Sequence, residues 1–531
     1  MRRTLMRYPC EKIAKDGGEK HMLTNAIAIF SFWEKRPSAA LRNSKFKIQN
    51  SKCLWIPAAG HKRAGGLFLP RCTRTKISAI GLALVLALVT LGLPVRAQEE
   101  SETNQEANNA SQFARDWCQK RANLEEEAQT TIELLLRKVG ATECEEASKR
   151  LASLSKLDLK GNQVIDIAPL SALTNLTDLN LSSNKIQDIS PLSKLVNLTK
   201  LNLNGNHIAD TSPLSGLNKL TELALSINQI ADISPLSGLS NLRILELSTN
   251  QIADLSPLQS DTALAQLDLK NNQIEDISPL GRLTNLVQLD LETNKIADIK
   301  IISALTKLKQ LSLNRNEIAD ISSLSALTKL NQLSLNRNQV ADIGALSTLT
   351  KLNQLSLNYN QIEDISVLSG LTNLTKLDLF ENKIKDIGSI ANLTNLAKLG
   401  LSGNEISDLS PLSGLTNLTG LGLSNNQITD LSPLSGLTNM MGLGLKYNQI
   451  SDLSPLSGLT GLTGLWLYGN KISEVSPLSE LKNLVGLGLD DNQITDIASL
   501  SELSNLTFLS VSNNPIANKI CPVTPRSVCR L

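Results

Sequence analysis

Residues 415–436 read LTNLTGLGLSNNQITDLSPLSG, and residues 437–458 repeat nearly the same letters as LTNMMGLGLKYNQISDLSPLSG. The shared pattern is Leu-x-x-Leu-x-Leu-x-x-Asn-x-Ile-x-Asp-Ile-x-Pro-Leu-x-x-Leu, which starts at Leu154 and returns every 22 residues without an insertion. Repetition at a fixed period of this length predicts a stack of similar turns and not several separate domains. The repeat asparagines are Asn162, Asn184, Asn206, Asn228, Asn250, Asn272, Asn294, Asn316, Asn338, Asn360, Asn382, Asn404, Asn426, Asn448, Asn470, Asn492 and Asn514.

The spacing of the leucines predicts a parallel sheet. In Leu-x-Leu the two leucines point to one face of a short strand, and the residues between them point to the other face. The Asn amide both donates and accepts hydrogen bonds, so it can satisfy backbone groups where the chain leaves the strand. We therefore predict that the asparagines form a structural ladder and not a ligand site.

An Asp follows these asparagines by four positions, from Asp166 to Asp496, with Glu474 and Asn518 as exceptions. One interpretation is calcium held between successive carboxylates. The other is that each Asp accepts a backbone N–H group at the start of a short helical turn, next to a Pro. A calcium site needs several converging oxygens and this column supplies one carboxylate per turn, so we favour the second interpretation and predict no metal and no cofactor.

A Pro occupies the position seven residues after the Asn in most turns, but the middle of the array lacks it. Without this stiffening residue, the outer side of these turns is predicted to be looser or coiled differently. The substituted positions are Ile301, Ser323, Ala345, Val367 and Ser389.

The 22-residue leucine-rich repeat, with Asp-Ile or Asp-Leu and then Pro-Leu after the strand, resembles that of the internalin-like bacterial proteins over residues 151–518. The FARDWC and ATEC segments ahead of it are similar to those of secreted cyanobacterial-type repeat proteins. The resemblance implies an α/β leucine-rich-repeat solenoid, with a curved parallel sheet on the concave face and short 3-10 or loop turns on the convex face. The sequence contains neither the immunoglobulin-like domain that usually follows internalin repeats nor a cell-wall sorting signal, so host-cell invasion is not implied.

The formal charge of +2 combines two unlike parts. Residues 1–97 hold 18 Lys and Arg against 4 acids, so residues 98–531 hold 34 bases against 46 acids. An acidic body without a basic stripe argues against a nucleic-acid partner. His207 is the only histidine after residue 97. The repeats show none of the phosphate-loop, HExxH, paired CxxC or GxSxG motifs, so we predict no catalytic residues and no enzyme.

Residues 71–97 have the layout of a secretory signal, with a basic lead, an apolar run over 77–93 and small residues before a cut after Ala97. The alternative is an uncleaved anchor, in which 77–93 is the only contact with the membrane. Both interpretations place the body in the periplasm, on the cell surface or outside the cell. Residues 1–70 fit poorly upstream of a signal, so we expect translation to start close before Arg71, and N-terminal sequencing of the precursor tests this.

Residues 98–111 are polar and are predicted to be a flexible lead-in, and residues 112–150 to be a helical N-terminal cap on the repeats. The apolar residues at helical spacing that predict the cap are Phe113, Trp117, Leu124, Ile132, Leu135, Leu136 and Val139, ahead of Gly140.

Four cysteines lie after residue 97, two in each end segment and none in the repeats. In an exported protein this suggests one disulfide closing each end, Cys118 with Cys144 and Cys521 with Cys529 in a C-terminal cap over 519–531. The alternative is free buried thiols.

A ligand surface is expected at the outward positions of the strands, which vary without harm to the core. The middle turns present a flat polar ladder, with Arg315, Arg337 and Tyr359 along one column. Later turns expose glycines, which we interpret as a bare strip that a ligand approaches closely, although duplication of one founding turn would also explain them. The glycines are Gly400, Gly420, Gly422, Gly442, Gly444, Gly464, Gly486 and Gly488, bordered by Tyr359 and Phe380 on one side and by Tyr447, Trp466 and Tyr468 on the other.

These features predict a non-enzymatic, exported binding module whose concave face recognises a protein. Exposed aromatic residues beside a shallow floor are what a peptide- or sugar-binding surface uses. The alternatives are a structural protein of the envelope or matrix, and a surface protein that binds glycans. Loss of binding on changing Trp466 and Tyr468 would favour recognition over the structural role.

Overall fold

A computed structural model of the protein describes residues 112–518 and 520–530. All described residues belong to one compact unit. The segments predicted for 1–70, 71–97 and 98–111 lie outside the described residues. Within the described part of the chain, no helix is both long enough and apolar enough to cross a membrane.

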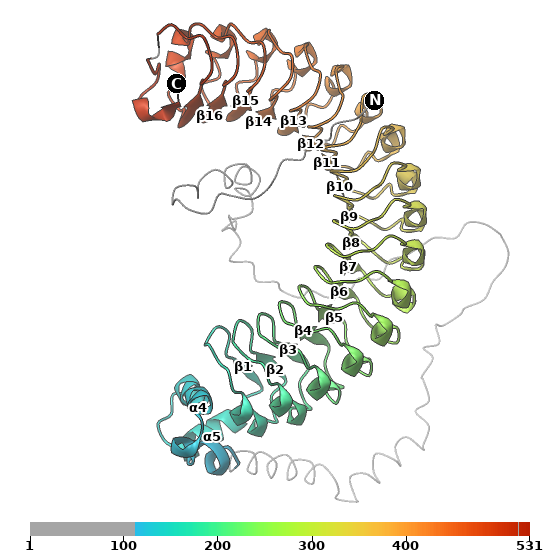
Figure 1. The fold of residues 1–531 in the computed structure, drawn as a ribbon, viewed down its shortest axis with the longest axis vertical. Helices are drawn as coiled ribbons and strands as arrows, with labels where there is room; N and C mark the ends of the chain where they lie inside the picture. The colour runs from blue at the N-terminus through green and yellow to red at the C-terminus, as the bar shows by residue number, and fades with distance from the viewer. Residues whose placement is uncertain (1–111, 519, 531) are drawn as a thin grey trace, which may run out of the picture. The chain divides into compact units, whose positions relative to one another are not determined.

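Each of the seventeen turns contributes one three-residue strand, and the strands pair in parallel with equivalent residues side by side, as Leu333 does with Leu311 and Leu355. Figure 1 shows these strands on the inner side of the stack of turns. The strands are β1 (Lys156–Asp158), β2 (Asp178–Asn180), β3 (Lys200–Asn202), β4 (Glu222–Ala224), β5 (Ile244–Glu246), β6 (Gln266–Asp268), β7 (Gln288–Asp290), β8 (Gln310–Ser312), β9 (Gln332–Ser334), β10 (Gln354–Ser356), β11 (Lys376–Asp378), β12 (Lys398–Gly400), β13 (Gly420–Gly422), β14 (Gly442–Gly444), β15 (Gly464–Trp466), β16 (Gly486–Gly488) and β17 (Phe508–Ser510).

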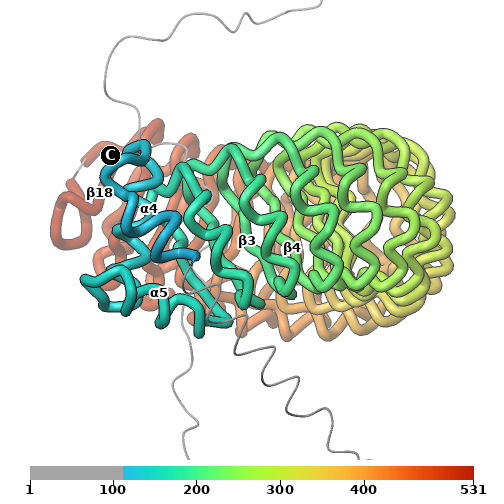
Figure 2. Tube along the Cα trace, turned by 90° about the horizontal axis from the view of Figure 1, so that it is seen from below, coloured from blue at the N-terminus to red at the C-terminus, as the bar shows by residue number. Residues whose placement is uncertain are grey.

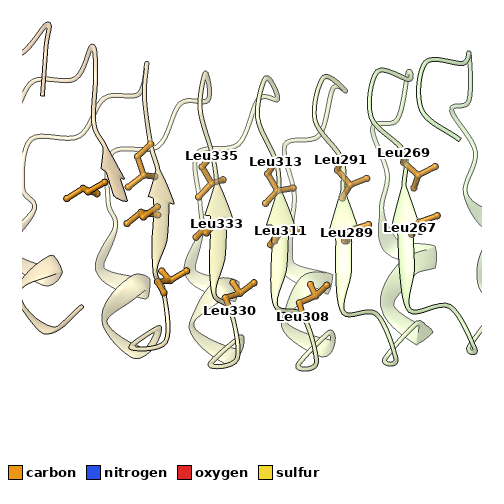
Figure 3. Close-up of a cluster of buried hydrophobic side chains, with 14 of the residues drawn as sticks. Leu267, Leu269, Leu289, Leu291, Leu308, Leu311, Leu313, Leu330, Leu333 and Leu335 are labelled. Carbon is orange, nitrogen blue, oxygen red and sulfur yellow. The ribbon is translucent and has the colours of Figure 1, made fainter. Parts of the chain in front are cut away.

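The leucines behind the sheet form one continuous core. Figure 3 shows equivalent leucines repeated from turn to turn, for example Leu308, Leu311 and Leu313 in one turn. All three are at most 3% exposed. Each turn buries its leucines against the neighbouring turns, so stability comes from stacking and not from any one repeat. The predicted leucine-rich-repeat solenoid is confirmed.

A short 3-10 helix follows almost every strand on the opposite side of the turn (Figure 1). Its start is held by the acidic column, since Asp364 Oδ1 accepts the N–H of Ser366 at 2.8 Å. This hydrogen bond is the largest cause that lowers the pKa of Asp364. The backbone-capping interpretation of the column is therefore confirmed. Among the described residues no group of three or more His, Cys, Asp or Glu is placed to hold a metal ion.

The turns without Pro differ from many of those that have it. Four of the five have a 3-10 helix of five residues. In the Ser-Pro-Leu turns, η5–η7 and η14–η17, the 3-10 helix is only three residues long. Pro is not the sole determinant, because η3, η4 and η8 contain it and also span five. The helices are η3 (Ala168–Ala172), η4 (Ser190–Lys194), η5 (Ser212–Leu214), η6 (Ser234–Leu236), η7 (Ser256–Leu258), η8 (Ser278–Arg282), η9 (Lys300–Ala304), η10 (Ser322–Ala326), η11 (Gly344–Thr348), η12 (Ser366–Gly370), η13 (Gly388–Ile390), η14 (Ser410–Leu412), η15 (Ser432–Leu434), η16 (Ser454–Leu456), η17 (Ser476–Leu478) and η18 (Ala498–Glu502).

The repeat asparagines link consecutive turns through backbone groups. The amide of Asn338 donates to Leu335 O in its own turn at 3.1 Å and to Leu313 O in the preceding turn at 2.9 Å. Its Oδ1 accepts the N–H of Ile318 at 3.1 Å. The same pattern returns along the array, which is the structural role that the sequence predicts for this residue.

Helices close the N-terminal end of the stack, where Figures 1 and 2 place them against the first turns. They are a π-helical turn at Phe113–Cys118, a 3-10 turn at Arg121–Asn123, α4 (Glu126–Val139) and α5 (Cys144–Ala152). The α4 helix ends as predicted, since Gly140 takes a φ of 63° that favours glycine. The α5 helix follows Gly140, after the amphipathic pattern ends, and lies within the predicted helical cap except for its last two residues. A disulfide joins Cys118 to Cys144, and the Thr131 hydroxyl donates to Asp166 O at 2.7 Å.

The C-terminal segment closes the other end by continuing the sheet. It contains a 3-10 turn at Arg526–Val528 and an unpredicted strand, β18 (Cys529–Arg530), which pairs in parallel with β17. A disulfide joins Cys521 to Cys529.

One core position departs from the repeat. Asp261 stands eleven residues after Asn250, where the neighbouring turns carry Leu239 and Leu283. It is 1% exposed, and neither carboxylate oxygen has a hydrogen-bond partner. The nearby Ser260 hydroxyl donates to Ser237 O instead, at 3.2 Å. Burial is the main cause that raises the pKa of Asp261 to about 6.

Candidate ligand-binding face

The outward face of the sheet is built from four positions in each turn, which lie six, four, two and one residue before the repeat Asn. In the middle turns these positions carry Gln, Ser, Asn and Arg. Asn336 Oδ1 accepts the N–H of Asn358 at 2.8 Å, and Asn358 Oδ1 accepts the N–H of Phe380 at 2.8 Å. Part of this polar ladder is therefore engaged within the protein.

The residue just before the Asn has a left-handed backbone in each of the seventeen turns. Arg315, Arg337 and Tyr359 have φ values of 55°, 57° and 56°, which non-glycine residues seldom adopt. The Arg337 guanidinium lies 4.2 Å from the centroid of the Tyr359 ring, which is a cation–π contact. Tyr359 is 46% exposed, so this pair presents a fixed aromatic surface beside the ladder.

Three aromatic rings meet near the C-terminal end of the same face. The centroid of Trp466 lies 6.0 Å from that of Tyr468 and 5.9 Å from that of Phe508, and all three side chains are half-buried. These distances are typical of favourable aromatic pairs. We call Trp466, Tyr468 and Phe508 the aromatic cluster.

Glycines make room for these rings. A Cβ on Gly486 would lie 3.1 Å from Trp466 Cη2, and one on Gly488 would overlap the ring of Tyr468. The ring of Phe380 fills the same volume over Gly400, at 2.5 Å from an added Cβ. The expectation of a bare strip is therefore wrong at these three glycines, because the protein's own aromatic side chains occupy the space.

Two cations accompany the aromatic cluster. The Lys446 ammonium lies 4.8 Å from the centroid of Tyr468 and 5.6 Å from that of Trp466, and the Arg530 guanidinium lies 5.2 Å from that of Phe508. Burial lowers the pKa of Lys446 and raises the pKa of Tyr468 to about 12. The negative charge of Asp490 raises both pKa values. It therefore counteracts the lowering of the Lys446 pKa by burial and adds to the rise of the Tyr468 pKa.

The predicted aromatic residues do not form a single site. Tyr359 and Trp466 are five turns apart, which is roughly 24 Å at the spacing of parallel strands. Tyr447 is 56% exposed, and its ring occupies the space that a Cβ on Gly469 would need. The face thus has two aromatic regions, one at Arg337 and Tyr359 and the other at the aromatic cluster.

Sequence reasoning missed Phe508, Lys446 and Arg530 as members of the second region. A signal for Lys446 and Phe508 was available, because both occupy outward positions of the repeat. Arg530 gave no such signal, since it joins the face only through β18, outside the repeat pattern.

Comparison with known families decides what kind of protein this is. The family model described as Leucine Rich repeats (2 copies) matches overlapping stretches that together cover residues 152–260, 262–414 and 442–480, more than half of the chain. The chain belongs to the leucine-rich-repeat family. Among curated proteins, no relative matches this leucine-rich-repeat protein.

Solved structures of other leucine-rich-repeat proteins are similar over the repeats. An internalin (inlF) of Listeria monocytogenes is 34% identical, with 69% of this chain and 95% of that one covered and a TM-score of 0.51. A protein of Leptospira interrogans is 29% identical, with coverage of 67% and 94% and a TM-score of 0.61. The functional domain of InlJ from Listeria monocytogenes is 25% identical, with coverage of 68% and 75% and a TM-score of 0.57. The predicted internalin-like type of repeat is confirmed.

Proposed function

We propose that this leucine-rich-repeat protein is a non-enzymatic, exported recognition module that binds a protein partner on the concave face of its sheet. The fold is of the kind used for protein–protein recognition. The observation that carries the proposal is the aromatic cluster, because Trp466, Tyr468 and Phe508 lie half-buried on the outward face of strands β15–β17.

The chemistry and the rigidity of the cluster both suit binding. Trp and Tyr are enriched among the residues that dominate interface energies, since they bring a large apolar area with a polar tip. Trp466 and Tyr468 pack over Gly486 and Gly488, and Lys446 covers part of their rings. Rings held in this way lose little conformational freedom when a partner binds.

Export is supported by the closed ends and by the relatives. Disulfides at Cys118–Cys144 and Cys521–Cys529 are typical of proteins that fold in an oxidising compartment. Together with the internalin-like relatives, they indicate an extracellular or surface protein. The predicted signal or anchor at 71–97 is consistent with this location.

Arg315, Arg337 and Tyr359 supply a second contact region in the proposal. Both regions lie on one continuous sheet, whose strands pair from β8 to β15, so one extended partner that follows the face would reach both. The Arg337 guanidinium places a positive charge beside the Tyr359 ring, as the Lys446 ammonium does beside the aromatic cluster.

The test is a pull-down of native envelope and culture-fluid proteins with the purified protein and with a Trp466→Ala, Tyr468→Ala double variant. Tyr359→Ala probes the second region. Val196→Ala is the matched control, since Val196 is 49% exposed but lies outside the strands. We expect a protein captured by the wild type and the control to be lost with the double variant.

Three other results would redirect the proposal. A partner lost only with Tyr359→Ala would move the main contact to the middle turns. Capture that depends on glycan, and disappears after deglycosylation of the extract, would favour a glycan-binding protein. Failure of every variant and of the wild type to capture anything would favour the structural role in an envelope or matrix.

A further inference from the structure

Next to the aromatic cluster, strands β13 and β14 have no side chains at two of their outward positions. A Cβ added at Gly442 would have no atom within 4 Å. One added at Gly420 would lie 3.9 Å from Lys398 Cγ, and one added at Gly444 would lie 3.4 Å from Ser424 Oγ. These three glycines therefore remain open, unlike Gly486 and Gly488. We call Gly420, Gly442 and Gly444 the glycine bay.

The bay lies between filled strands on both sides. Phe380 covers Gly400 and approaches Gly422, where an added Cβ would lie 3.2 Å from its Cε1. Trp466 stands on β15 at the other side, directly paired with Gly444. From β12 to β15 the bay is roughly 14 Å wide along the stack, at the spacing of parallel strands. Its floor is backbone whose polar groups are paired between strands, so it suits an apolar group.

Lys446 stands at the edge of this bay, two residues after Gly444, and it differs from other lysines of the sheet face. It forms no salt bridge among the described residues, and its ammonium rests over the Tyr468 and Trp466 rings. The lysines elsewhere on the face that do pair are Lys156 with Asp178 at 3.5 Å, Lys200 with Glu222 at 2.6 Å, Lys270 with Glu292 at 3.2 Å and Lys376 with Asp378 at 3.0 Å.

Asp490, whose negative charge raises the pKa of Lys446, forms no salt bridge with it among the described residues, and one Asp490 oxygen is already engaged. Asp490 Oδ1 accepts the Ser510 hydroxyl at 2.5 Å and the N–H of Ser512 at 3.0 Å. A half-buried ammonium without a carboxylate partner is a favourable site for one, because a charge-assisted hydrogen bond is stronger where water is partly excluded. Arg530 adds a second positive charge at the far side of the cluster.

We propose that the glycine bay and Lys446 bind an acidic segment of a partner polypeptide. The segment places an apolar side chain in the bay and an Asp or Glu carboxylate on the Lys446 ammonium, with Arg530 available to a second acid. A polypeptide fits better than a glycan, because the floor of the bay is mostly backbone whose polar groups are already paired between strands, and the Ser424 hydroxyl beside Gly444 is the one side-chain hydroxyl near the three open glycines of the described chain. This inference rests on the proposed function and names the class of partner.

The test is selection of peptides from a random dodecapeptide display library on the purified protein, followed by affinity measurements by fluorescence anisotropy. Selected peptides are expected to be enriched in Asp or Glu beside Leu, Ile or Phe. Synthetic copies with Gln in place of Glu, or Asn in place of Asp, should bind about tenfold more weakly. Added salt should weaken the acidic peptides more than the neutral copies.

The variants separate the charge from the bay. Lys446→Met keeps most of the stem packing and should bring acidic and neutral peptides to the same affinity, whereas Lys446→Arg should retain a preference. Gly442→Gln fills the bay with the residue that Gln332 and Gln354 supply in the same column, and it should weaken binding about tenfold or more. Gly458→Gln is the matched control, because Gly458 is exposed, lies outside the strands and has nothing within 4 Å.

Each other outcome overturns the inference in a distinguishable way. Peptides selected without acidic enrichment, or unaffected by Lys446→Met, would exclude the acidic partner. If those peptides were still lost with the Trp466→Ala, Tyr468→Ala variant, the proposed function would stand. Selection that yields no peptides, with heparin fragments binding in a Lys446-dependent manner, would replace the polypeptide by an anionic glycan and overturn both proposals. No binding by either probe would overturn the acidic segment, and the pull-down would then decide the proposed function by itself.

Discussion

Replacing Asp261 with Leu should stabilise the protein, and more so at neutral pH than in acid. Asp261 occupies a core position where adjacent turns have Leu239 and Leu283, and its carboxylate is 1% exposed without a hydrogen-bond partner. A leucine therefore restores the residue type that the neighbouring turns carry at this position. The substitution also removes a buried carboxyl group, whose ionised form is unfavourable in apolar surroundings.

The magnitude follows from the pKa. Burial raises the pKa of Asp261 from 3.8 to about 6. Below pH 3.8 the carboxyl group is protonated in both the folded and the unfolded chain, so it causes no pH-dependent loss. Between pH 3.8 and about 6 only the unfolded chain ionises, and stability falls as pH rises. Above about pH 6 the loss of folding stability is complete. It amounts to roughly 3 kcal/mol, because a shift of one pKa unit corresponds to about 1.36 kcal/mol.

The assay is chemical unfolding of the wild type, Asp261→Leu and Asp261→Asn at pH 4 and pH 7. Differences between proteins are needed at each pH, because exposed carboxyl groups such as Asp364 and Asp408 have lowered pKa values and change stability in the opposite direction. The advantage of Asp261→Leu should be roughly 2 kcal/mol larger at pH 7 than at pH 4. Asp261→Asn should show the same pH trend with a smaller gain, since its amide is still buried.

An equal advantage at both pH values would refute the reasoning, because it would mean that burial does not raise the pKa of the Asp261 carboxyl group. A loss of stability with Asp261→Leu would show that the turn does not accept the residue of its neighbours. Hydrogen exchange in the turn around Asp261 locates the effect, since repeat proteins can open locally without unfolding as a whole.

Three further predictions concern the repeat geometry, each checked by unfolding of the variant beside the wild type. Asn338→Ala leaves the Ile318 N–H without its acceptor and removes one of the two amide donors of Leu313 O and of Leu335 O, and should lose about 1 to 3 kcal/mol; no loss would mean that water replaces the amide. Gly488→Ala should lose about 1 to 3 kcal/mol because its Cβ overlaps Tyr468, while Gly458→Ala should stay within about 0.5 kcal/mol, and equal effects would contradict the packing argument. Ile227→Asn should gain about 1 kcal/mol, since Ile227 is β-branched, 60% exposed and has a φ of 59° that Asn tolerates; a loss would point to an unrecognised contact.

The repeat pattern alone was enough to predict the solenoid. Leucines at fixed spacing can bury themselves only against the same leucines of the next turn, so the period dictates parallel stacking. The roles of the asparagine and aspartate columns also followed, because each side chain acts on backbone groups a few residues away or at the equivalent position of the next turn. Asn338 and Asp364 illustrate the two cases.

The end segments were predicted less completely. The α4 helix has an amphipathic pattern and a glycine at its end, whereas α5 is short and mostly polar and so gave no clear signal. The β18 strand is two residues long, and it forms because β17 offers an unpaired edge. Such a strand depends on its neighbour and not on its own sequence.

By itself, the sequence determined the repeat fold, the sheet register and the face on which a ligand surface must be sought, because these follow from local periodicity. Only the tertiary structure decided how that face is used. Trp466, Tyr468 and Phe508 come from two turns that are not adjacent, and they meet because Gly486 and Gly488 leave space between them. Whether a glycine is open or covered depends on the conformation of the neighbouring turn's side chain, which no single repeat encodes.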